Sequence, residues 1–229
     1  MRRLLLAFAA PLALAACATT PAEQTWDIHG KRGLVVIEAE PVGPLLRESA
    51  AYELGIGAFS PETGQFRIAA FGGWVSTGAM GEGPNARRYF IGAAEPGTYA
   101  IQELRVTHWG ACFNGGTKMF DVVPGTVTFV GRIDPNPSIL AIVRGHLPRY
   151  AHQSDYYYVF DTPRPTLTPP DQLPGWEAGV KEHLAGLPAA NAPLRAAELR
   201  DASFNPGRDV FGIQKLCGGY YAKPKGAAG

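Results

Sequence analysis

The sequence has few of the residue patterns that mark metal centres, redox motifs or nucleic-acid binding. Its 229 residues include three cysteines and five histidines, and these form neither a closely spaced Cys/His cluster nor the i, i+4 histidine pair of a zinc site. Lysine and arginine together number 21 against 20 acidic residues. They do not cluster into the basic patch with which proteins neutralise phosphates. We therefore expect no local metal motif and no nucleic-acid partner.

Motifs for nucleotide binding and for nucleophilic hydrolysis are also missing. The glycine-rich run at residues 78–83 has the wrong spacing for a dinucleotide fingerprint, and no helical pattern follows it. There is no Gly-x-Ser-x-Gly elbow, and the carboxylates are scattered rather than paired. The sequence consequently predicts no catalytic, cofactor-binding or metal-ligating residue.

The N-terminal apolar run is shorter than the roughly 20 residues that a transmembrane helix needs. It covers residues 4–16, contains Pro11 and follows two arginines. A basic flank before a short apolar run is typical of a cleaved signal peptide, so residues 1–16 are excluded from the fold. The end of the run, Leu14-Ala15-Ala16-Cys17, resembles the lipobox of bacterial lipoproteins.

This resemblance implies cleavage before Cys17, a diacylglyceryl thioether on its sulfur and an acyl chain such as palmitate on its new amine. Two or more chains give stable membrane anchoring, whereas one chain gives only marginal binding. Ala18 follows the cysteine, which resembles the pattern of lipoproteins that travel to the outer membrane. We expect residues 17–25 to be a lipidated tether on the periplasmic face of that membrane. The alternative is an ordinary secretory signal whose cleavage site contains a cysteine.

Two cysteines remain once Cys17 is assigned to lipid, namely Cys112 and Cys217. In an oxidising compartment, pairing is the default for such residues. We predict a disulfide that ties the C-terminal segment to the middle of the chain. Two separately buried thiols are the alternative, because sequence does not reveal the Cα separation that a bridge requires.

The composition favours an all-β fold. The chain has 28 glycines and 20 prolines, which suits many turns rather than long helices. Alternating or β-branched runs predict strands at residues 33–41, 52–59 and 65–71, whereas residues 72–85 are glycine-rich and predict a surface loop. Residues 26–161 are therefore expected to form one β-sandwich domain.

Two similar apolar runs, at residues 88–101 and 118–131, are each broken by Pro-Gly. Proline followed by glycine suits a type II turn, whose twist does not match that of a tight hairpin. We therefore expect arches that pass between two sheets. After the second turn, Val127, Phe129 and Ile133 are predicted to share the buried face of a strand. These features predict a mainly antiparallel β-sandwich.

The spacing around the second Pro-Gly, with Phe120-x-Val122 before it and Val127-x-Phe129-x-Gly131 after it, resembles a group of uncharacterised bacterial lipoproteins. Their fold is a transthyretin-like or immunoglobulin-like β-sandwich. The resemblance is confined to residues 87–134. It implies a fold class and carries over no functional residue.

The C-terminal part is expected to differ from the sandwich. Residues 138–144 and 155–160 predict edge strands, and residues 162–175, with five prolines, predict an extended connection. One amphipathic helix should follow before Pro188, because apolar residues recur there at helical spacing: Leu173, Trp176, Val180, Leu184 and Leu187. Residues 194–204 suit a helix or a final strand, and residues 212–217 are expected to return to the sandwich. Helix and returning segment occupy residues 176–221, and residues 222–229 form a disordered tail.

Two functional hypotheses follow from these features. The first is a non-enzymatic structural or binding module of the cell envelope, which contacts membrane lipid through Cys17 and an envelope protein or glycan through its loops. The second is an envelope hydrolase or metal-dependent enzyme whose site assembles only in the fold. His146 and His152 lie near Asp155 and are the candidates for it, although exposed loop histidines are a simpler explanation. Two aromatic groups suit either ligand stacking or ordinary packing: Trp74 with Trp109, and residues 156–158.

Overall fold

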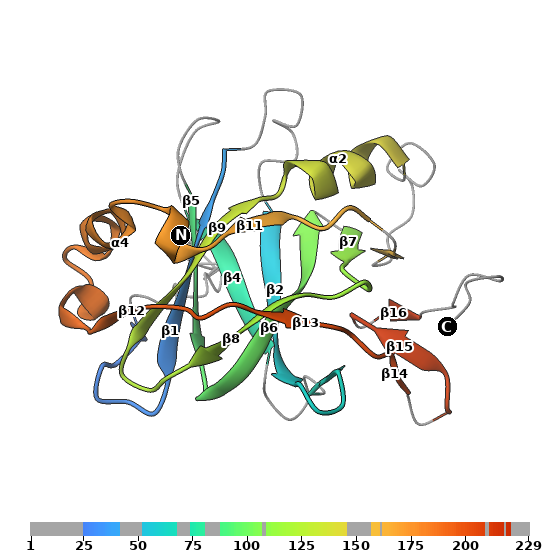
Figure 1. The fold of residues 1–229 in the computed structure, drawn as a ribbon, viewed down its shortest axis with the longest axis horizontal. Helices are drawn as coiled ribbons and strands as arrows, with labels where there is room; N and C mark the ends of the chain where they lie inside the picture. Colours follow the sequence, from blue (N-terminus) through green and yellow to red (C-terminus); the bar gives the residue numbers. More distant parts are fainter. Residues whose placement is uncertain are drawn as a thin grey trace, which may run out of the picture.

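The structure, a computed structural model, describes residues 25–41, 52–67, 74–80, 88–106, 109–145, 157–160, 162–208, 211–217 and 219–220. This part of the chain is mainly β, with two short helices (Figure 1). The predicted all-β class is confirmed at this level. The predicted lipidation site, Cys17, and the predicted tail lie outside the described residues.

Thirteen strands form one sheet, whose main order is β10-β7-β6-β2-β4-β5-β1-β9-β11, with β3, β8, β12 and β13 paired off this path. A separate sheet contains β14, β15 and β16. The strands are β1 (Gly33–Ala39), β2 (Tyr52–Ser60), β3 (Gln65–Phe66), β4 (Trp74–Met80), β5 (Arg88–Ala94), β6 (Gly97–Val106), β7 (Trp109–Cys112), β8 (Thr117–Val122), β9 (Val127–Asp134), β10 (Tyr157–Val159), β11 (Thr166–Thr168), β12 (Leu194–Ala196), β13 (Arg200–Ala202), β14 (Gly207–Arg208), β15 (Gln214–Leu216) and β16 (Gly219–Tyr220).

The large sheet is mixed and curls into a half-barrel. Most of its pairs are antiparallel, but β9 runs parallel to both β1 and β12, and β10 runs parallel to β7. Residues 194–202 cross the open side of the half-barrel, because β12 pairs with β9 and β13 then pairs with β8. This crossing strand, red in Figure 1, links two edges that the rest of the sheet leaves apart.

The first predicted strands are present, but the loop predicted at residues 72–85 is wrong in part. Strands β1 and β2 match the predicted runs, and β2 forms the expected hairpin with β3. Residues Trp74–Met80 form β4, which pairs with β2 on one side and β5 on the other. This strand was not predicted because its glycine-rich sequence has a weak intrinsic preference for β structure. It forms because its backbone is hydrogen-bonded to strands on both sides, and these bonds outweigh that preference.

Neither Pro-Gly connection is a tight hairpin, as predicted, but each joins two strands of the one large sheet rather than strands of two separate sheets. Strands β5 and β6 do not pair with each other, and neither do β8 and β9. The φ angle of Gly125 is 66°, which fits the third position of a type II turn. The φ angle of Gly97 is 148°, so the type II prediction is wrong at the first connection.

A β-bulge in β9 changes which of its residues share a face. Val36 of β1 pairs with Phe129, but the next residue, Ile37, pairs with Gly131, so Val130 is an extra residue. Beyond the bulge the alternation is inverted. Val127 and Phe129 therefore face one apolar cluster, whereas Ile133 faces the other, and the prediction of one shared face is wrong.

Residues 138–144, predicted as an edge strand, instead lie in helix α2 (Asn136–Gly145). The carboxylate of Asp134 accepts a hydrogen bond from the backbone N–H of Asn136 at 3.0 Å and stabilises the helix start. Ile139 and Ile142, one helical turn apart, are buried in the main core. The apolar residues of this run thus recur at helical spacing. The run is too short for its sequence to distinguish a helix from a strand.

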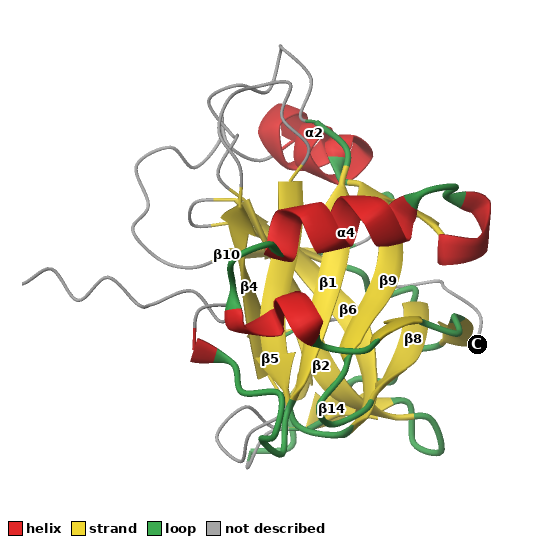
Figure 2. Ribbon diagram, turned by 90° about the vertical axis from the view of Figure 1, so that its left-hand side faces the viewer, coloured by secondary structure: helices red, strands yellow, loops and turns green. Residues whose placement is uncertain are grey.

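The predicted amphipathic helix is confirmed as α4 (Trp176–Leu184), whose Val180 and Leu184 are buried. It lies across the outer face of β1 and β9 (Figure 2), where the ring of Trp176 stacks on that of Phe129 at 4.7 Å. This outer cluster comprises Trp26, Leu34, Val36, Tyr89, Ile91, Val127, Phe129, Leu173, Val180, Leu184, Ala189 and Ala192. Because the main core covers the opposite face, all seven residues of β1 are buried.

The remaining C-terminal elements also depart from expectation. The proline-rich stretch contains β11, which pairs with β9, followed by the short 3-10 helix η3 (Pro170–Gln172). A second 3-10 helix, η4 (Pro188–Asn191), precedes β12. Residues 212–217 enter the three-stranded sheet rather than the large one, although Leu216 and Cys217 reach the main core. No helix in the described ranges has the length and apolar character needed to cross a bilayer.

Candidate functional groove

A groove lies where the neighbours of β9 separate. Strand β12 pairs with residues 127–129 of β9, and β11 pairs with residues 132–134. Between β11 and β13 is a hollow of about 110 Å³, and beside it, between η3 and the β12–β13 connection, is a larger one of about 580 Å³. Both are lined by Lys118 and Leu167, so we treat them together as one groove.

The floor of the smaller hollow is apolar. Ile101 and Ile133, which line it, are buried members of the main core. The hydroxyl of Thr117 donates a hydrogen bond to the carbonyl oxygen of Ile101 at 2.7 Å and holds the start of β8 against β6. The floor is therefore a fixed part of the half-barrel wall.

Charged side chains form the rim of the groove. The Nζ atom of Lys118 lies 2.7 Å from Oδ1 of Asp201, which is the partner of Lys118 in the β8–β13 register. A hydrogen bond and the positive charge of Lys118, with a smaller contribution from Arg164, lower the pKa of the Asp201 carboxyl. Arg164 also lines this hollow, so two cations flank one carboxylate above the apolar floor.

A second pair strengthens the same strand contact. Nη2 of Arg200 lies 2.8 Å from Oδ2 of Asp121, whose other oxygen accepts a hydrogen bond from the Thr98 hydroxyl at 2.6 Å. Exposed ion pairs contribute little to stability individually. Both pairs join β13 to β8, so charged contacts accompany the strand pairing along this wall of the groove.

The larger hollow has the dimensions of a ligand site, for which about 300 to 1,000 Å³ is typical. One wall is Pro169, Pro170, Asp171 and Gln172, and the other is residues 196–199. Asp171 and Glu198 are exposed on opposite walls. The lining thus combines aliphatic, proline and charged side chains.

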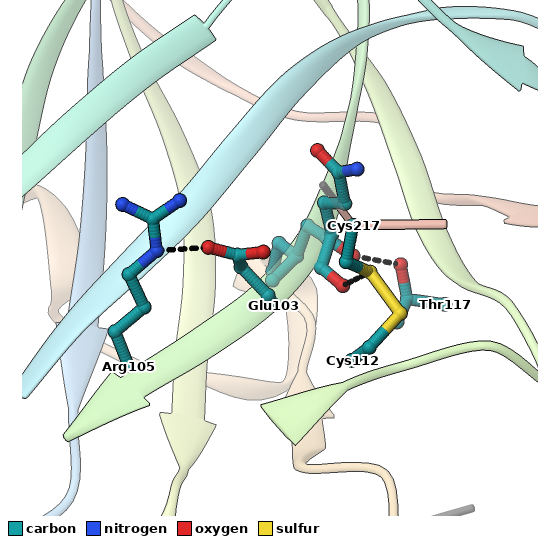
Figure 3. The surroundings of a disulfide bond; sticks show 7 residues. Glu103, Arg105, Cys112, Thr117 and Cys217 are labelled. Atoms are coloured by element: carbon teal, nitrogen blue, oxygen red, sulfur yellow. Dashed lines mark hydrogen bonds and ion pairs between the residues drawn. A yellow bond between two sulfur atoms is a disulfide. The ribbon is translucent and has the colours of Figure 1, made fainter. Parts of the chain in front are cut away.

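The structure contains the predicted disulfide between Cys112 and Cys217, with Cα atoms 5.7 Å apart (Figure 3). Cys217 Sγ lies 3.1 Å from the carbonyl oxygen of Gln102, so the bridge is packed against β6. Nearby, the buried Glu103 carboxylate pairs with Nε of Arg105 on the same strand (Figure 3). These contacts make the bridge a structural attachment for the C-terminal sheet.

A separate buried ion pair lies on the outer face of the sheet. The Glu38 side chain is 2% exposed and lies 3.0 Å from Nε of Arg132, its neighbour across β1 and β9. Arg132 also reaches Glu40 at 3.5 Å. A buried carboxylate needs such a partner, so this pair is explained by the packing of the two strands.

Two of the five histidines lie in the described part of the chain, and each has a local contact. His183 packs on Tyr89 with ring centroids 4.6 Å apart, and His29 belongs to a turn with Asp27. The structure does not describe His108, His146, His152 or Asp155. The described residues contain no group of three or more potential metal ligands.

The two aromatic groups lie on strands at one edge of the large sheet or within it. Trp109 begins β7, and its backbone pairs with Tyr157 of the edge strand β10. Trp74 begins β4 and pairs with Gly57 of β2. The side chains of these two tryptophans and of Tyr157 and Tyr158 lie outside the description, as does Tyr156.

Sequence analysis did not identify the groove residues. Lys118 and Asp201 are 83 positions apart, and Asp201 lies in a stretch that suited either a helix or a strand. Their proximity follows from the crossing of the half-barrel by β12 and β13, for which the sequence has no local signal. No protein-family model matches the sequence, and the searches of curated proteins and of solved structures found no significant similarity.

Proposed function

We propose that this protein is a lipid-anchored, non-enzymatic binding module of the bacterial cell envelope, held by Cys17 on the periplasmic face of the outer membrane. Its ligand site is the groove, and its ligand is an extended peptide segment of an envelope protein. Its curled sheet serves as a rigid, sandwich-like support for the site. The observation that carries this proposal is the hollow of about 580 Å³ between η3 and the β12–β13 connection.

Several properties of the groove favour an extended peptide as its ligand. The walls are themselves extended or tightly turned segments. Residues 197–199 connect β12 to β13, and the backbone N–H of Ala197 donates a hydrogen bond to the carbonyl oxygen of Phe129 at 2.8 Å. Peptides bind such walls through main-chain hydrogen bonds, while alternate side chains enter pockets. An apolar side chain fits the small hollow over Ile101 and Ile133. Lys118 and Arg164 at its rim favour a ligand with a carboxylate next to that side chain.

The test is site-specific photo-crosslinking in living cells of the source bacterium. A benzophenone side chain at Leu199, which lines the groove, is expected to crosslink to one contiguous segment of an envelope protein, identified by mass spectrometry. Ala196→Arg, which fills the groove from an exposed position, should reduce this crosslink at least about tenfold. Ala185→Arg, an equally exposed change beyond α4, should leave it intact.

A benzophenone at Ala178, on the exposed side of α4, controls for random collisions. The proposal is wrong if Ala178 gives the same products as Leu199. It is also wrong if the Leu199 products persist in the Ala196→Arg variant.

A further inference from the structure

Phe211 and Ile213 are the two large apolar side chains that lie exposed in the described part of the chain, at 83% and 48%. Both are on the loop that joins β14 to β15. Burying such side chains in an apolar environment is favourable, so their exposure together at a hairpin tip indicates a surface that contacts something else.

The loop between β14 and β15 is attached to the main core by the residues that follow it. Leu216 and Cys217, which follow it, are buried in the main core, and Cys217 is bridged to Cys112. Across the loop, Nη1 of Arg208 donates a hydrogen bond to the carbonyl oxygen of Gly212 at 2.7 Å. The strands that flank the two apolar residues lie at one end of the molecule (Figure 1).

The charge around the tip is positive. The hairpin sequence, residues 207–216, contains two basic residues, Arg208 and Lys215, and one acid, Asp209. Arg208 and Lys215 flank the tip on the two strands of the hairpin. Apolar side chains flanked by basic residues match a phospholipid surface, which supplies both an apolar interior and anionic headgroups.

We propose that Phe211 and Ile213 insert into the interface of an anionic phospholipid bilayer, with Arg208 and Lys215 at the headgroups. This second membrane contact rests on the proposed lipid anchor, which keeps the domain near the bilayer. Residues 17–24 span at most about 28 Å when extended, and Trp26 packs in the outer cluster with α4, at the end of the molecule away from the C-terminal sheet. Anchor and tip together would hold the domain lengthwise along the membrane.

The experiment uses the full lipidated protein in vesicles of phosphatidylcholine and phosphatidylglycerol. Phe211→Trp adds a fluorophore at the tip, and subtracting the wild-type spectrum isolates it from the four native tryptophans. Brominated lipids should reduce this added emission, because a side chain inserted at the interface lies near the acyl chains that carry the bromine. A matched Glu198→Trp, in the groove that must stay open to its ligand, should show little quenching.

A second set of measurements tests whether the membrane contact requires the positive charge of Lys215 and the negative charge of the lipid. Lys215→Glu in the Phe211→Trp protein should weaken the quenching, and vesicles of phosphatidylcholine alone should have the same effect. Lys181→Glu, an exposed change on α4, should have none. Equal quenching at positions 198 and 211, or none at 211 in anionic vesicles, overturns the membrane contact. Mass spectrometry of the same sample for lipid on Cys17 tests the anchor separately, so failure of the tip and failure of the anchor are distinguishable.

Discussion

At the scale of single residues, two carboxylates have pKa values below their ordinary range for different reasons. Asp201 is stabilised in its charged form by the hydrogen bond and charge of Lys118, on another strand. Glu62 is stabilised by its own backbone N–H and by the Ser60 hydroxyl, within one turn. The first shift depends on tertiary structure, whereas the second is local.

This difference gives a prediction for Lys118→Met. The pKa of Asp201 should rise toward its ordinary value, because the variant removes the hydrogen-bond donor and the charge, whereas the pKa of Glu62 should not change. Carboxyl resonances followed by NMR as a function of pH measure both. If both pKa values move together, the variant has disturbed the fold rather than one ion pair.

The sign of the accompanying stability change follows from the lowered pKa. A carboxyl with a lower pKa in the folded protein contributes stability above its unfolded pKa, and this contribution is lost as the pH falls through the folded value. The stability difference between wild type and Lys118→Met should therefore be present near neutral pH and vanish in strong acid. The effect should be small, since the Asp201 side chain is 89% exposed.

At the scale of elements, the bulge in β9 decides how β11 meets the sheet. Gly131 has a φ of 131°, and a Cβ atom there would lie 2.3 Å from the carbonyl oxygen of Thr168 in β11. The close approach permits the β9–β11 pairing that forms one side of the groove. Glycine is required here both by the backbone angle and by the space.

Gly131→Ala should therefore destabilise the protein by about 3 kcal/mol, the sum of backbone strain and a clash that the Thr168 backbone cannot avoid without moving. Gly97→Ala is the matched control, because its φ is also positive, at 148°, but a Cβ there meets nothing within 4 Å. Its cost should be only about 1 kcal/mol. Urea unfolding of both variants measures the difference. Equal costs would contradict the clash and attribute the whole effect to the backbone angle.

At the scale of the whole molecule, the proposed anchor determines where the groove operates. Globomycin, which blocks lipoprotein signal cleavage, should leave an uncleaved precursor, and Cys17→Ser should give the same result because the sulfur that receives the lipid is gone. Ala18→Ser, next to it, should still be cleaved and lipidated. Mass spectrometry of the mature N-terminus measures cleavage and lipid together. Normal processing in globomycin, with no lipid on Cys17, would show that the leader is an ordinary secretory signal.

The sequence predicted those elements whose own residues carry the signal. Helix α4 was identified because Val180 and Leu184 lie at helical spacing, and β1 because an uninterrupted β-branched run suits a strand covered on both faces. Prediction failed at β4 and α2. The first is glycine-rich and held by its neighbours, and the second is too short for its period to be distinguished from that of a strand. The bulge at Val130 was missed because one extra residue has no local signature.

The sequence by itself determined the β-rich class, the absence of a tight hairpin at each Pro-Gly and the availability of Cys112 and Cys217 for pairing, because each depends on turn chemistry, on local side-chain pattern or on the count of cysteines. Only the tertiary structure decided that residues 194–202 cross the half-barrel, that Lys118 meets Asp201 and that Phe211 and Ile213 remain exposed. These features join positions far apart in the chain. Their contacts depend on how strands are ordered in space, which local preferences do not specify.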